Sequence, residues 1–262
     1  MPQVLADTPR MPAFASSGPF QHAAFAVLLF GGWELYARWM GNFVLLPPPS
    51  RVVFAFYDLI VSGKLIPALL NSMWLLFVGL VTAFVFAFVF GVLVGRYRVM
   101  DLTLSPYFNA LYALPTVALV PLVLVWLGFG FSGRLLVVLL AAFFPMLINT
   151  YTGVKVPPQD LVEVAKSFGV RGEFAMLRRV VLPAAFPFIM AGIRLGIGRG
   201  VVGMAIAEVY MRLGGIGALI VGFGSVFKTD YVIAAIAPLP LLGIGLTQLF
   251  AYLEKRVAYY RT

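Results

Sequence analysis

Long apolar runs separated by polar connections dominate the pattern along the chain. A transmembrane helix needs about 20 mainly apolar residues. The six stretches that meet this requirement are residues 23–40, 72–95, 104–127, 135–152, 184–209 and 231–253. These runs are continuously apolar over helical lengths, whereas the strands of a transmembrane barrel alternate apolar and polar residues over about ten positions. The pattern therefore predicts an all-α integral membrane protein with six transmembrane helices.

The connection between the fourth and fifth apolar runs is the most polar part of the chain. We predict a short amphipathic helix at residues 160–168, a sharp turn at Gly169 and a second short helix at 172–181. The first helix has an apolar face although it lies outside the bilayer. That face consists of Leu161, Val164, Ala165 and Phe168. Either a cytoplasmic partner receives this face, or the helix lies on the inner leaflet of the membrane.

The N-terminus and the first connection add two further expectations. Residues 1–21 hold four prolines and one arginine, which indicates a retained, flexible cytoplasmic tail rather than a signal peptide. Residues 22–262 then form one transmembrane domain. Within the outer connection, at 41–71, an amphipathic stretch at 52–60 predicts a further short helix.

Composition supports a membrane protein and excludes several kinds of chemistry. Of the 262 residues, 62% are hydrophobic and 11% are charged, whereas soluble domains are about 25% charged. The chain has no Cys and a single His, which leaves no thiolate metal site, disulfide or His-based triad. The sequence shows no close pair of acid and base residues, or of metal ligands, that would indicate an enzyme. The glycine-rich phosphate-binding loop of ATPases is also missing, so another chain would have to hydrolyse ATP.

The net charge of +9 does not indicate nucleic-acid binding, because the basic residues are scattered among apolar runs and form no stripe. Their distribution between the connections instead indicates how the chain is oriented in the membrane. With the N-terminus in the cytoplasm and six crossings, eleven Lys and Arg residues fall on the cytoplasmic side and six on the outer side. The cytoplasmic set is Arg10, Arg96, Arg98, Lys155, Lys166, Arg171, Arg178, Arg179, Lys255, Arg256 and Arg261. Both termini are therefore expected in the cytoplasm.

The fifth apolar run carries features that concern the membrane interior. Gly192, Gly196 and Gly200 recur at a spacing of four, which favours close packing of another helix. Arg199 lies near the middle of the bilayer, where an arginine costs roughly 2.5 to 3.5 kcal/mol on insertion scales. It either lines a translocation path and offers positive charge to an anion, or forms a buried ion pair. Glu208, a second candidate for the path, projects from the opposite side of the helix.

The polar loop resembles the EAA loop of the permease subunits of ATP-binding cassette (ABC) importers. The family pattern is Glu-Ala-Ala, three residues, Gly, and then Leu-Pro about a dozen residues later. The matching residues are Glu163, Ala165, Gly169, Leu182 and Pro183. Val164 replaces the middle alanine, and the spacing from Gly169 to Leu182 is one residue longer than in the pattern. The longer spacing leaves the register of the second short helix open.

In that family the loop is a coupling helix that docks into a groove on the ATPase subunit. The resemblance assigns this role to Glu163, Ala165, Lys166, Gly169, Arg171, Leu182 and Pro183. Residues 114–128, 142–150 and 191–198 further resemble the nitrate, sulfonate and taurine branch. The implied fold is a type I, MetI-like permease bundle, with the coupling loop at 155–183.

The resemblance also implies partners and a location. A homodimer of this chain would work with two ATPase subunits and a periplasmic or lipid-anchored solute-binding protein, in the bacterial inner membrane. ATP and magnesium would be used by the ATPase, and this chain would bind no cofactor. The cargo would be a small solute of the nitrate, sulfonate or taurine type, anionic by expectation, with aromatic acids and pyrimidines still open.

A secondary transporter is the alternative function. Such transporters commonly carry acidic residues inside the membrane for ion coupling. Only Glu34 and Glu208 approach the bilayer here, both toward its outer side. Whether an ATPase co-purifies with the chain separates the two functions.

Overall fold

The computed structural model describes residues 18–155 and 159–257, and the regular structure of these residues is helical. The helices are α1 Gly18–Met40, α2 Pro49–Val61, α3 Leu65–Arg96, α4 Arg98–Tyr112, α5 Thr116–Leu127, α6 Phe131–Lys155, α7 Gln159–Ser167, α8 Glu173–Met176, the π-helix η1 Leu177–Val181, α9 Leu182–Met211, α10 Gly215–Ser225, α11 Thr229–Ile236 and α12 Pro238–Val257. The predicted short helices at 52–60 and 160–168 are confirmed as α2 and α7.

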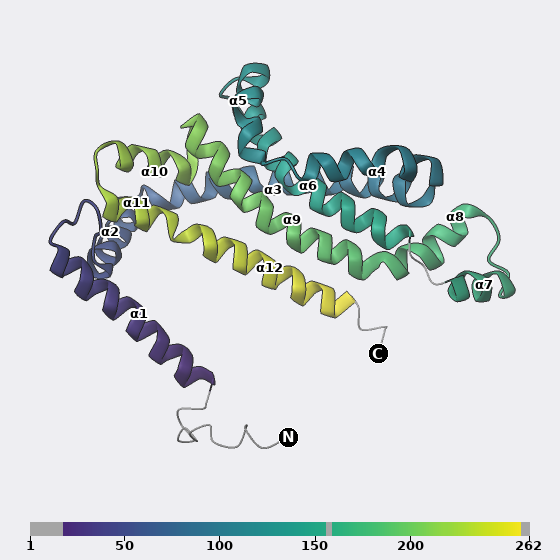
Figure 1. Cartoon of the computed structure of the whole chain (residues 1–262), viewed down its shortest axis with the longest axis horizontal. Helices are drawn as coiled ribbons and strands as arrows, with labels where there is room; N and C mark the ends of the chain where they lie inside the picture. Colours follow the sequence, from purple (N-terminus) through teal and green to yellow (C-terminus); the bar gives the residue numbers. More distant parts are fainter. Residues whose placement is uncertain (1–17, 156–158, 258–262) are drawn as a thin grey trace, which may run out of the picture.

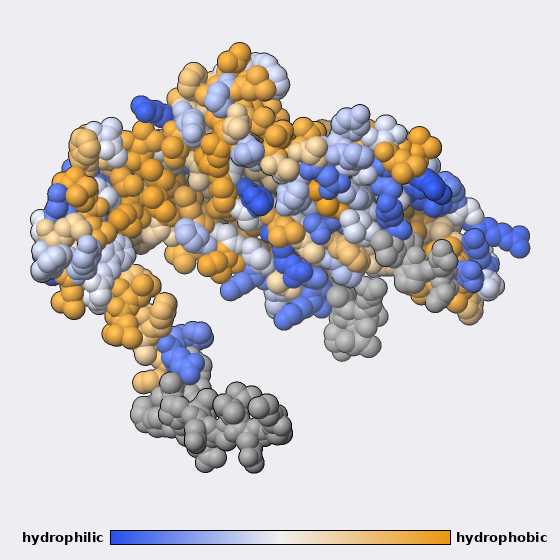
Figure 2. All heavy atoms as spheres, viewed as in Figure 1, coloured by the Kyte–Doolittle hydropathy of each residue, from blue (hydrophilic) through white to orange (hydrophobic). Residues whose placement is uncertain are grey.

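Three long helices form the centre of an elongated bundle. Helix α6 packs along both α3 and α9, and α12 packs on α9. Figure 1 shows these helices running side by side, with α7 at one end of the bundle and α10 at the other. We refer to these as the α7 end and the α10 end. Apolar side chains cover much of the bundle toward the α10 end, whereas hydrophilic residues gather nearer the α7 end (Figure 2). This distribution fits a bundle whose sides face lipid.

The predicted count of six spans is not confirmed. Four helical segments are long and apolar enough to cross a membrane: Leu65–Arg96, Phe131–Lys155, Glu173–Met211 and Thr229–Arg256. A fifth results if α4 and α5, which meet at a bend of 98°, count as one broken span. The segment at 104–127, predicted as one span, is therefore broken into two helices, because the chain turns sharply between Tyr112 and Thr116.

Helix α1 covers the first predicted span, at 23–40, but it is less apolar than the helices that meet the span criterion. It starts at Gly18, inside the predicted tail, and the rest of that tail lies outside the described residues. Gln21, His22, Glu34 and Arg38 lower its hydropathy, and α1 is not among the helices that meet the span criterion. Length alone therefore does not establish that α1 crosses the bilayer.

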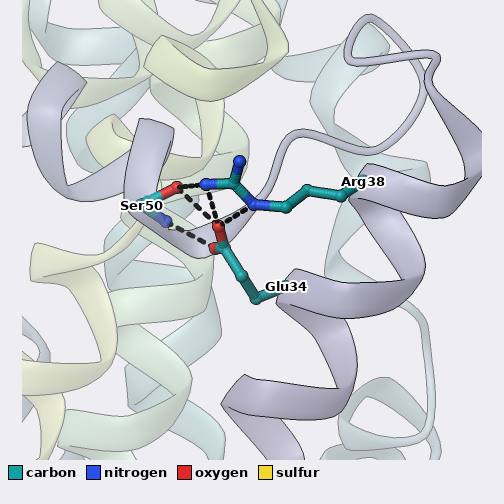
Figure 3. A network of polar contacts seen from close by, with 3 residues as sticks. All are labelled: Glu34, Arg38 and Ser50. Carbon is teal, nitrogen blue, oxygen red and sulfur yellow. Dashed lines mark hydrogen bonds and ion pairs between the residues drawn. The ribbon is translucent and has the colours of Figure 1, made fainter.

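A polar network fixes the junction between α1 and α2. The Glu34 carboxylate accepts hydrogen bonds from the Ser50 backbone N–H (3.0 Å), the Ser50 hydroxyl (2.8 Å) and Arg38 Nε (2.6 Å), as Figure 3 shows. Ser50 lies in the first turn of α2. A carboxylate placed there satisfies a free N–H group and interacts favourably with the helix dipole. Glu34 therefore holds the start of α2 against α1.

Candidate functional site

The predicted turn at Gly169 ends α7 in a defined hydrogen-bonded cap. Gly169 has a φ of +82°, a conformation that glycine adopts at little cost. Its N–H donates to the carbonyl of Lys166, and the next N–H, of Val170, donates to the carbonyl of Ala165, both at 3.0 Å. These two bonds make a Schellman motif, which stops the helix and turns the chain sharply. The loop therefore presents α7 in one fixed orientation.

Helix α7 has two apolar sides with different surroundings. Val162 and Ala165 pack inward, against the cluster formed by Val154, Met176, Val181, Ala185 and Ile189. Leu161, Val164 and Phe168 point outward, and Phe168 is 84% exposed. An exposed apolar face on an anchored helix is typical of a protein interface. The predicted apolar face therefore has two parts. Ala165 packs against the bundle, whereas Leu161, Val164 and Phe168 are exposed.

The charged residues of the loop surround a cavity of about 660 Å³ between α7, α8 and the ends of α3 and α6. Lys166 and Arg171 line it, together with Arg96 and Lys155. Arg96 pairs with Glu173 of α8 at 3.2 Å, and Lys155 pairs with Asp101 of α4. The Glu163 carboxylate is exposed and has no hydrogen bond or ion pair to any residue in 18–155 or 159–257. It is therefore available to a partner.

The extra residue of the loop is accommodated by an unusual turn. Residues 177–181 form a π-helix directly before Leu182 and Pro183, which open α9. A π-turn takes up about one residue more than an α-turn. The π-turn thus lies within the interval from Gly169 to Leu182, which is one residue longer than in the family pattern.

Helices α9 and α6 approach closely along the glycines singled out by their spacing. A Cβ atom at Gly192 would lie 2.9 Å from the Asn149 Cβ, and one at Gly196 would lie 3.2 Å from the Ala142 carbonyl oxygen. A Cβ at Gly200 would lie 2.9 Å from Leu80 of α3. These positions leave no room for a larger side chain without displacement of a neighbour.

Arg199 opens into a cavity of about 400 Å³ at the break between α4 and α5. Arg199 is exposed and lines this cavity, and it has no ion pair or hydrogen bond within the part of the chain that the structure describes. Arg194, one and a half turns earlier, pairs instead with Glu254 of α12 at 3.1 Å. Of the two predicted uses of Arg199, an ion pair within the chain is therefore not observed among the described residues.

Glu208 lies on the opposite side of α9 from Arg199 and is fully buried. Its carboxylate accepts hydrogen bonds from the Ser72 hydroxyl (2.8 Å) and the Gly217 N–H (3.0 Å), while the Ser72 oxygen accepts one from the Ile216 N–H (2.9 Å). In this conformation Glu208 joins α3 and α9 to the start of α10. A role on the translocation path stays a prediction.

The sequence alone did not identify the partners of Glu208. Ser72 is one hydroxyl at the start of an apolar run, and Arg134 is one of the six basic residues that the pattern places on the outer side. In the structure Arg134 is only 8% exposed, and its charge acts on the Glu208 carboxylate. No periodic pattern links residues 72, 134 and 208, which come from three different helices.

Comparisons with known proteins place the chain in a family. Residues 87–259 match the family described as binding-protein-dependent transport system inner membrane component. A putative ABC transporter permease of Methanocaldococcus jannaschii is 32% identical, over 91% of this chain and 90% of the relative. The putative aliphatic sulfonates transport permease SsuC of Bacillus subtilis is 31% identical, over 83% of this chain and 78% of its own. The taurine transport system permease TauC of Escherichia coli is 27% identical, over 88% and 86%.

The chain therefore belongs to the permease subunits of ABC importers, in the branch that includes the sulfonate and taurine permeases. This confirms the resemblance carried by the EAA loop and its flanking segments. It also makes the chain a multi-pass membrane protein and a transport subunit rather than an enzyme. Members of this family work in general with an ATPase and a solute-binding protein.

Proposed function

We propose that the chain is the membrane subunit of an ATP-driven importer that moves a small anion across the bacterial inner membrane by alternating access. A homodimer of the chain would form the path, with an ATPase dimer at the α7 end and a solute-binding protein at the α10 end. ATP and magnesium would be held by the ATPase, and no cofactor by this chain. Both termini would lie in the cytoplasm.

One observation carries the ATPase-coupling part of this proposal. Helix α7 is anchored from below by Val162 and Ala165, is closed by a Schellman motif, and still exposes Leu161, Val164 and Phe168. An anchored helix with a free apolar face transmits a push from a docked partner into the elements on which it rests. Its connection through α8 and the π-turn to α9 gives that push a direct route into the membrane.

The test is a pull-down of the tagged chain from native membranes in mild detergent, with bound proteins identified by mass spectrometry. Wild type should recover an ATPase, whereas Glu163→Lys and Gly169→Pro should lose it. Gly169→Pro removes an N–H donor and forces φ to about −65°.

Two matched controls lie at the α10 end. Gly63→Pro changes a glycine with a φ of +69° that closes α2, and Lys64→Glu reverses an exposed charge. Both should keep the ATPase. A wild-type chain that recovers no ATPase in several detergents would contradict the proposal.

A further inference from the structure

We propose that the cavity at the α4–α5 break is the binding site for the cargo inside the membrane, and that it selects a small organic anion with an apolar part and no ammonium group. The inference rests on the proposed transport function and concerns a site that function does not define. It is carried by the unpaired Arg199 and by the lining of the cavity.

Arg199 brings a positive charge to the cavity. An arginine at this depth faces protein, water or an opposite charge, because lipid cannot solvate it. Arg199 lines the cavity, and no carboxylate among the described residues pairs with it. A guanidinium with free N–H donors binds carboxylate and sulfonate groups through charge-assisted hydrogen bonds.

The rest of the cavity lining is mainly apolar and includes two hydroxyl-bearing residues. Tyr112 and Thr116, on the two sides of the break, offer hydroxyl groups that have no hydrogen-bond partner among the described residues. The remaining lining residues are apolar: Leu111, Ala113, Leu114, Pro115, Leu119, Leu140, Ala141 and Phe144. One charged group, two hydroxyls and an apolar wall match a ligand with an anionic head and a hydrocarbon or aromatic tail.

The size and charge of the cavity disfavour nitrate and zwitterionic ligands. Its volume of about 400 Å³ lies within the range of small-molecule sites, about 300 to 1,000 Å³, and is far larger than nitrate requires. No Asp or Glu is among the described residues that line it, so the ammonium group of a zwitterion such as taurine would lose water without gaining an opposite charge. The lining therefore favours an alkyl or aryl sulfonate or carboxylate over nitrate and over taurine.

The experiment measures binding to the purified full-length chain in phosphatidylcholine nanodiscs by titration calorimetry, with butanesulfonate, taurine and nitrate as probes. Wild type should bind butanesulfonate more tightly than the other two. Arg199→Gln should weaken butanesulfonate roughly tenfold to a hundredfold, the usual effect of losing hydrogen bonds to a charged group, and Arg199→Lys should recover part of the loss. Arg194→Gln is the matched control, because it removes a cation from the same helix outside the cavity.

A second variant keeps the test independent of the arginine. Leu114→Trp fills the cavity while leaving Arg199 in place, and it should also weaken butanesulfonate. Adding phosphatidylglycerol to the nanodiscs should leave butanesulfonate binding unchanged, since strong competition would mean that a lipid headgroup occupies the site. Unchanged binding in Arg199→Gln, or taurine binding as tight as butanesulfonate, would overturn the inference.

The outcome is separable from that of the proposed function. Arg199→Gln should still recover the ATPase in the pull-down. If it does, and its butanesulfonate affinity equals that of wild type, only the assignment of this cavity fails. If wild type recovers no ATPase, the proposed function fails whatever the nanodisc titrations give.

Discussion

Gly169 shows what one residue contributes to the EAA loop. A Cβ atom at this position would meet nothing within 4 Å, so the only obstacle to a side chain is the φ of +82°. Gly169→Ala should therefore destabilise the end of α7 by about 1 to 2 kcal/mol. Hydrogen–deuterium exchange should show faster exchange of the α7 amides.

The control for this prediction is Gly245→Ala in α12, which also adds a Cβ in open space but has no positive φ. Its helix should exchange no faster, because alanine stabilises a helix relative to glycine. Equal protection of α7 in wild type and Gly169→Ala would show that the Schellman motif does not hold the helix.

Glu208 is the residue whose removal should most affect the α10 end. Glu208→Ala leaves the Gly217 N–H and the Ser72 hydroxyl without their acceptor. We expect a loss of about 1 to 3 kcal/mol, measured as a lower unfolding temperature in detergent. Glu208→Gln keeps an acceptor and should lose less. The exposed Glu163→Gln should unfold like wild type, and an equal effect of all three variants would contradict the assigned contacts.

The α4–α5 break shows at the scale of an element what an apolar pattern can and cannot predict. Residues 104–127 are apolar enough for a span, and Pro115 identifies a place where the helix is weakened. The pattern contains no information on direction, because the packing of α5 on α6 and of α4 on α3 sets the 98° bend. By contrast α7 was predictable, since its boundaries depend on Gly169 and on local periodicity.

The cavity beside Arg199 was unpredictable for the same reason. Arg199 itself was identifiable as a charge in an apolar run. Tyr112 and Thr116 become its neighbours only because the chain turns between them. A straight third span would have carried these residues away from α9.

The π-turn before α9 gives a prediction about deletions. Because this turn takes up about one extra residue, removing the exposed Arg179 should convert it to an α-turn with little change in the unfolding temperature. Removing the exposed Leu195 from the regular part of α9 should rotate the rest of that helix by about 100° and separate its glycines from α6. Size-exclusion chromatography of fluorescent fusions should show a folded peak for the first deletion and aggregate for the second. Equal tolerance would mean that the π-turn does not absorb the insertion.

The outward face of α7 gives a second prediction at this scale. Phe168→Ala removes the most exposed aromatic side chain of that face without touching the anchor residues. ATPase affinity should fall roughly tenfold or more, as expected for an aromatic interface residue worth at least about 1.4 kcal/mol. Phe54→Ala, which removes a 69% exposed ring from α2 at the α10 end, should have no effect. Equal ATPase binding by wild type and Phe168→Ala would exclude this face as the docking surface.

At the scale of the whole molecule, the absence of Cys allows the orientation to be measured directly. Single cysteines at Ser167, the last residue of α7, and at Ser225, the last residue of α10, lie at opposite ends of the bundle and are both exposed. Because Lys and Arg concentrate on the α7 side, a membrane-impermeant maleimide added to intact spheroplasts should label Ser225→Cys, and Ser167→Cys only after permeabilisation. The reverse pattern would place the α7 end outside and exclude an intracellular ATPase there.

The same labelling decides whether α1 crosses the membrane. Its 23 residues reach about 34 Å at 1.5 Å per residue, enough for the hydrocarbon core, but its polar residues and its anchorage to α2 through Glu34 also suit a helix lying at the surface. His22→Cys lies near the start of α1, and Asn42→Cys lies just after its end. We expect Asn42→Cys to be labelled from outside and His22→Cys only after permeabilisation, because Leu28, Leu35 and Trp39 are more than 70% exposed and require an apolar neighbour. If both sites react in intact spheroplasts, α1 lies on the outer surface, the bundle has at most five spans, and the N-terminus is not cytoplasmic.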